Sequence, residues 1–65
     1  MIKIKKHEIV RTRDLEGFYI IAKNPLEALK SFCLNMKFKK EDTKVAERKL
    51  SYVLINNGDV YVLRK

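Results

Sequence analysis

The sequence predicts a small α+β domain in which one antiparallel sheet of about four strands carries a single helix packed on one face, in the chain order ββαββ. Three observations lead to this prediction: a capped helix signal in the middle of the chain, and a hairpin signal on each side of it. Because the chain has only 65 residues, residues 1–65 are expected to form a single domain with a small core.

Residues 11–23, RTRDLEGFYIIAK, predict the first hairpin. Asp14 and Gly17 suit the first and last positions of a type I turn, with Gly17 in the left-handed conformation and Asp14 opposite Phe18. The face expected to pack beneath the helix then holds Val10, Thr12, Phe18, Ile20 and Ala22. The other face is basic and aromatic, and it holds Arg11, Arg13, Tyr19, Ile21 and Lys23.

The start of the first strand is expected to break or bulge near residues 6–7. Strict alternation puts Lys6 and Glu8 on the same side as Ile2 and Ile4. Since charged side chains are rarely buried, an interruption of the strand at this point would keep them out of the core.

Residues 24–37 carry the clearest element, a helix that begins at Pro25. Asn24 suits the N-cap, Pro25 needs no backbone donor at the first helical position, and Glu27 completes a pattern that resembles a capping box. One apolar stripe is predicted to face the core, formed by Leu26, Ala28, Leu29, Phe32, Cys33 and Met36. Lys37 adds positive charge at the carboxyl end, so we expect the helix to end near it.

Residues 41–49, EDTKVAERK, leave two alternatives open, because Val45, Ala46 and Leu50 fit neither the helical nor the strand period well. The interpretation that we favour is a long third strand that begins at about Val45. The alternative is a short second helix capped by Asp42.

Residues 50–64, LSYVLINNGDVYVLR, predict the second hairpin, because Asn57 and Gly58 suit a type I′ turn that puts Asn56 opposite Asp59. One face then holds Leu50, Tyr52, Leu54, Tyr61 and Leu63, and the other holds Val53, Ile55, Val60 and Val62. Since both faces are apolar, this hairpin is expected either to lie in the centre of the sheet or to have its second face covered.

The net charge of +7 is the strongest global signal, and it favours nucleic acid or acidic protein surfaces as partners. Residues 1–13 carry +4 and residues 36–49 carry +3, around a nearly neutral middle. No apolar run approaches the roughly 18 residues that span a bilayer, so no membrane association is expected. The first ten residues, MIKIKKHEIV, lack the apolar block of a signal peptide, which favours a cytoplasmic location.

Catalysis is not expected. Cys33 lies in the apolar stripe of the helix, which is typical of an inert core thiol, and His7 between Lys6 and Glu8 is typical of a surface residue. The adjacent carboxylates of Glu41 and Asp42 diverge in a helix or a strand, and both glycines are turn residues rather than parts of a phosphate loop. We therefore predict a non-enzymatic protein with no cofactor and no metal site.

Nucleic-acid binding of low sequence specificity is the function that we favour, with RNA and DNA both left open. Lysines and arginines gain affinity by releasing counterions from phosphates, and exposed tyrosines stack on unpaired bases. The predicted binding residues are Arg11, Arg13, Tyr19, Lys23, Lys37, Lys39, Lys40 and Lys44.

The alternative function is protein binding, as an inhibitor or an accessory subunit. An apolar second sheet face suits a homodimer or a larger partner, and the positive charge suits an acidic surface or one that normally binds nucleic acid. Small phage-borne anti-defence proteins that block a nuclease are an example of this behaviour.

One stretch resembles a known family. The run FYIIAKNPLEALKSF, residues 18–32, is similar to the strand, cap and helix of the archaeal ribosomal protein LX family, in which a small β-rich domain binds ribosomal RNA. The resemblance covers 15 of 65 residues, and the flanking strands do not follow the pattern of that family.

Overall fold

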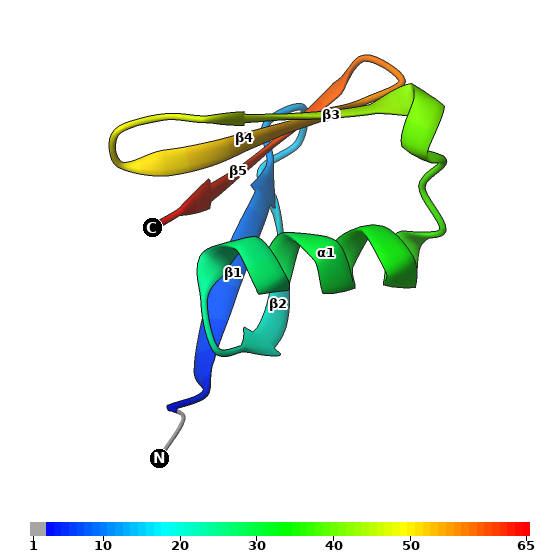
Figure 1. The fold of residues 1–65 in the computed structure, drawn as a ribbon. Coiled ribbons are helices and arrows are strands. Elements are labelled where there is room, and N and C mark those ends of the chain that lie inside the picture. Colours follow the sequence, from blue (N-terminus) through cyan, green and yellow to red (C-terminus); the bar gives the residue numbers. More distant parts are fainter. Residues whose placement is uncertain (1–2) are drawn as a thin grey trace.

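A computed structural model describes residues 3–65 and shows one five-stranded antiparallel sheet with a single helix (Figure 1). The α+β class, the single sheet and the single helix are confirmed, whereas the predicted four strands and the order ββαββ are matched only in part, because the sheet has a fifth strand. The sheet has the strand order β2-β1-β5-β4-β3. The elements are β1 (Lys5–Arg11), β2 (Glu16–Ala22), α1 (Pro25–Met36), the 3-10 turn η1 (Lys40–Asp42), β3 (Thr43–Glu47), β4 (Ser51–Asn56) and β5 (Asp59–Arg64).

The fifth strand arises because the predicted long third strand folds back on itself. Residues 48–50 form a turn that the backbone N–H of Arg48 closes by donating to the carbonyl of Ser51 at 2.7 Å. The turn has no glycine or proline, so the usual turn signals do not mark it. Leu50, predicted to lie on the core face, is in this turn and 76% exposed.

The first hairpin forms, but the predicted register is wrong: Phe18 lies opposite Ile9 rather than Asp14. The turn occupies residues 12–15, and Leu15, not Gly17, has the left-handed backbone conformation, with a φ of 59°. The Asp14 carboxylate accepts a hydrogen bond from the backbone N–H of Glu16 at 3.2 Å, which stabilises this turn. The observed register buries Ile9 completely and leaves Thr12 exposed in the turn.

Strand β1 has no break at residues 6–7, because its seven residues all pair with β2. The alternation has the opposite phase to the predicted one: Ile9 lies on the helix side, and Lys6 and Glu8 lie on the other face. Ile4 precedes the strand and is exposed, and Ile2 lies outside the described residues.

Both ends of α1 agree with the prediction. The Asn24 side chain accepts a hydrogen bond from the backbone N–H of Glu27 at 2.9 Å. At the other end Lys37 takes a left-handed φ of 58°, and the backbone N–H of Phe38 donates to the carbonyl of Cys33 at 3.0 Å. This geometry, rather than charge alone, ends the helix and turns Phe38 back toward the sheet.

The core lies between α1 and the helix-facing side of the sheet. Ala28, Leu29 and Phe32 of the predicted stripe are buried, whereas Leu26 and Met36 are exposed. The ring of Phe32 lies 5.2 to 5.6 Å from those of three other aromatic residues; these are Phe18, Phe38 and Tyr61. Ile9, Leu54 and Leu63 complete the buried set.

The second hairpin has the predicted register, with Asn56 opposite Asp59 and Leu54 opposite Tyr61. Asn57 and Gly58 have the positive φ values of a type I′ turn, 48° and 87°. Asn56 is buried, and its amide donates to the Thr43 hydroxyl at 2.8 Å, which fixes the start of β3 against the hairpin.

The centre of the second sheet face is apolar, as predicted for the second hairpin, and α1 does not cover it, since the helix lies on the other side of the sheet (Figure 1). Its central side chains are Val10, Val53, Ile55, Val60 and Val62, of which Ile55 is exposed and the four valines are half-buried.

Replacing Phe38 with alanine is expected to lower the free energy of unfolding by about 2–4 kcal/mol, because the change opens a cavity against Phe32 and Tyr61. Leu34→Ala is the control, because Leu34 lies in the last turn of α1 and is 78% exposed. This change is expected to alter the free energy of unfolding by less than about 0.5 kcal/mol. Urea unfolding followed by circular dichroism measures both. Equal losses in the two variants would contradict the assigned role of Phe38.

Candidate anion-binding cleft

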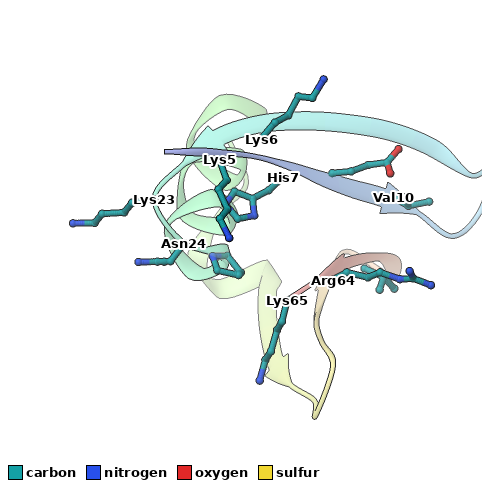
Figure 2. Close-up of a pocket in the computed structure, with 11 residues that line it drawn as sticks. Lys5, Lys6, His7, Val10, Lys23, Asn24, Arg64 and Lys65 are labelled. Atoms are coloured by element: carbon teal, nitrogen blue, oxygen red, sulfur yellow. The ribbon is translucent and has the colours of Figure 1, made fainter. Parts of the chain in front are cut away.

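A cleft lies where β1 extends beyond its neighbour β5. Ile9, Val10 and Arg11 pair with β5, whereas residues 5–8 pair only with β2. The open side of β1, the end of β5 and the start of α1 border a cavity of about 670 Å³ (Figure 2). The N-terminal end of a helix carries partial positive charge, so this border favours anions.

Five of the eleven residues that line the cleft are cationic; these are Lys5, Lys6, Lys23, Arg64 and Lys65. Glu8 is the one carboxylate in the lining. Among residues 3–65 only Lys65 of these cations has a carboxylate partner, Glu47 at 2.7 Å. The cleft therefore presents a positive potential that internal ion pairs leave largely uncompensated.

His7 lies in the cleft with its ring held in place. Its Nε2–H donates to the backbone carbonyl of Ala22 at 3.1 Å, and the side chain is half-buried. In Figure 2 the Lys5 side chain points toward the His7 ring, whereas Lys6 points away to the other side of the strand. His7, predicted to be a plain surface residue, thus helps to form a wall of the cleft.

Two of the predicted binding residues, Arg11 and Arg13, are engaged in ion pairs. Arg11 lies 2.8 Å from Asp14 and 3.3 Å from Glu16, and its guanidinium carbon lies 5.6 Å from the centroid of the Phe18 ring. The hydrogen bond to Asp14 raises the pKa of Arg11 above its usual value. Arg13 contacts Asp59 at 3.4 Å. Both arginines therefore stabilise the β1–β2 turn region.

Tyr19 lies on the sheet face opposite to Arg11, so the predicted shared surface of these two residues is wrong. The difference follows from the register, which pairs Tyr19 with Glu8. The Tyr19 hydroxyl donates to the Glu8 carboxylate at 3.1 Å, which raises the pKa of Tyr19. Lys6 Nζ lies 4.9 Å from the centroid of the Tyr19 ring.

The predicted lysines divide into two basic regions. Lys23 lines the cleft at the start of α1. The other four lie at or beyond the far end of the helix; these are Lys37, Lys39, Lys40 and Lys44. All four are exposed and without a carboxylate partner among residues 3–65. Helix α1 has 12 residues, so about 18 Å separates the two regions.

Sequence reasoning missed Lys5, Lys6, Arg64 and Lys65. They meet because Ile9 pairs with Leu63, a contact between the two ends of the chain. The charge of +4 over residues 1–13 indicated a basic surface at this end of the chain. Because a break was predicted near residues 6–7, the strand register there could not be used to place these cations on the sheet.

Other chemistry is limited in the described part of the chain. Burial raises the pKa of the Cys33 thiol, which makes it a poor nucleophile at neutral pH, and Cys33 and His7 line different hollows. Residues 3–65 contain no group of three histidine, cysteine or acidic side chains that could hold a metal ion. None of their helices is long and apolar enough to cross a membrane.

The Asp14 carboxylate should make stability depend on pH. The hydrogen bond from Arg11 lowers its pKa from 3.8 to about 2, so the carboxylate stabilises the folded state above about pH 3.8 and this contribution is lost as the pH falls toward 2. We expect Asp14→Asn to be less stable than the natural protein at neutral pH and equally stable near pH 2, as measured by urea unfolding. If the stability difference between the two proteins were the same near pH 2 as at neutral pH, the charge of Asp14 could not be its cause.

Comparisons of the chain with models of protein families, with curated proteins and with solved structures find no match. The likeness of residues 18–32 to the ribosomal protein LX family therefore remains a local resemblance.

Proposed function

We propose that this protein binds the phosphate backbone of nucleic acid through the cationic cleft, with low sequence specificity and without catalysis. The observation that supports the proposal most is the charge of the lining: it contains five cations and one carboxylate, and four of these cations have no carboxylate partner among residues 3–65.

Lysine-rich surfaces bind nucleic acid mainly by releasing counterions, which gives affinity without base readout. The second basic region, with Lys37, Lys39, Lys40 and Lys44, extends the surface. A distance of about 18 Å corresponds to about five phosphates along one strand of B-form DNA. A strand that occupies both regions would thus be at least that long.

Tyr19 remains in the proposal as a stacking surface for an unpaired base. It is 61% exposed, and its neighbour Lys6 also lines the cleft. Stacking on one exposed aromatic ring contributes about 1–3 kcal/mol and tolerates any base, which is consistent with low sequence specificity.

The test is fluorescence anisotropy with labelled single- and double-stranded DNA and RNA between about 50 and 200 mM salt. We expect affinity to fall steeply with salt, and Lys5→Gln/Lys23→Gln to reduce the slope of log affinity against log salt by about two. Arg13→Gln, which removes a cation already paired with Asp59, is expected to change the slope less.

Arg48→Gln/Lys49→Gln is the matched control, since it removes the same charge from the exposed turn between β3 and β4, outside both basic regions. An effect equal to that of the cleft variant would show that net charge, rather than the cleft, determines binding. Absence of binding to all four nucleic acids at low salt would refute the proposal.

A second candidate function is protein association through the open sheet face, and the occupant that we propose is a second copy of the chain. The supporting observation is the uncovered aliphatic surface around Val62, which pairs with both Val10 and Val53. Two copies each carry +7 and repel, so added salt should strengthen this association. Nucleic-acid binding has the opposite salt dependence.

Val62→Lys is expected to abolish a dimer, because it places a charge in the centre of the apolar face. Size-exclusion chromatography with light scattering, at low and high salt, measures the mass. Leu34→Lys, at an exposed helix position, is the control and should leave the dimer intact. A natural protein that is monomeric at every salt concentration would contradict this candidate and favour a different protein as the occupant.

A further inference from the structure

An apolar groove runs between α1 and the edge strand β3. Helix α1 packs over β2 and β5 and leaves the β3 side of the same face partly open. The groove has a volume of about 550 Å³, and its apolar lining consists of Leu26, Leu29, Cys33, Leu34, Phe38 and Val45. Leu26, Leu34 and Val45 are 45%, 78% and 47% exposed, so the groove is open to solvent.

The lining has three polar side chains: the neutral hydroxyl of Thr43 and the ammonium groups of Lys30 and Lys40. The Thr43 hydroxyl donates to the carbonyl of Lys39 at 2.7 Å and accepts from Asn56, so its hydrogen bonds are satisfied within the protein. Lys30 and Lys40 are the two charged groups of the lining, and neither has a carboxylate partner among residues 3–65. An occupant that complements this groove has an apolar body and a negative charge.

The shape and the size restrict the occupant further. The helical part of the lining runs from Leu26 to Leu34, about 12 Å at 1.5 Å per residue, which suits an elongated molecule. Nine residues line the groove, whereas a stable protein interface takes about 20–30 residues on each side. The volume lies within the range of small-molecule sites, about 300–1,000 Å³.

We propose that this groove binds a single linear amphiphile with an anionic head, of the fatty carboxylate type. The hydrocarbon chain lies along Leu26, Cys33 and Leu34, and the carboxylate is bound by Lys30 and Lys40. The groove shares no lining residue with the cationic cleft, and Lys40 is the residue that it has in common with the second basic region.

Cys33 lies in the groove and reports its occupancy. We expect dodecanoate, below its micelle concentration, to slow alkylation of Cys33 by iodoacetamide in proportion to occupancy, measured at alkaline pH because burial raises the pKa of this thiol. Lengthening decanoate to dodecanoate should lower the half-protection concentration by up to about 15-fold, since each buried methylene contributes to affinity. Circular dichroism of the same samples checks that the fold is retained.

Charge-matched controls test the role of the lysines. Dodecyltrimethylammonium, with the same chain and the opposite charge, should not protect Cys33. Lys30→Gln/Lys40→Gln should raise the half-protection concentration of dodecanoate about tenfold, because it removes charged hydrogen-bond donors. Lys5→Gln/Lys23→Gln removes equal charge from the cleft and should leave it unchanged.

Three outcomes would overturn the proposal. Equal protection by the cationic amphiphile would show unspecific apolar binding. Protection that rises with protein concentration alone would show that a second copy covers the groove. Protection by vesicles of anionic lipid, without protection by monomeric dodecanoate, would show that the groove binds a membrane surface.

Discussion

The packing of three aromatic rings around Phe32 is the interaction on which the rest of the structure depends. Phe18 comes from the first hairpin, Tyr61 from the second and Phe38 from the segment after α1, and each ring lies within 5.2 to 5.6 Å of Phe32. A fold built from about 65 residues has few side chains with which to exclude water, so large rings contribute a major share of the buried apolar area. The left-handed Lys37 is therefore a requirement of the core, because it returns Phe38 to it.

Because the core is concentrated around Phe32, apolar side chains elsewhere on the sheet and the helix remain accessible to solvent. One 12-residue helix covers the sheet near β2 and β5, and it reaches neither the β3 side nor the second face. The groove beside Cys33 and the valine-rich face around Val62 both follow from this imbalance between five strands and one helix. The cationic cleft has a different origin, the unequal lengths of the pairings that β1 makes with β2 and β5.

Local signals in the sequence were sufficient where a few neighbouring residues determine the backbone. Asn24 fixes the helix start, and Asn57 with Gly58 fixes the second hairpin. The first hairpin was misread because Leu15, a residue with no preference for positive φ, takes the left-handed position. The cleft was beyond local reasoning, since it depends on the pairing of Ile9 with Leu63 across the length of the chain. The predicted lysines are surface cations without a carboxylate partner among residues 3–65, whereas Arg11 and Arg13 are paired with acids. Which cations lie side by side could be predicted only with the correct strand register.

The positions of the aspartate and glutamate side chains determine which lysines and arginines have no ion-pair partner and can therefore bind a ligand. Asp14, Glu16 and Asp59 contact Arg11 and Arg13, so these two guanidinium groups have structural partners. The unpaired cations of the described chain are mostly lysines. A lysine ammonium acts as a mobile point charge, whereas an arginine fork selects a fixed geometry of phosphate or base edge. A surface whose free charge resides mainly on lysine is therefore suited to follow a phosphate backbone of any sequence, and it is poorly suited to distinguish one base from another.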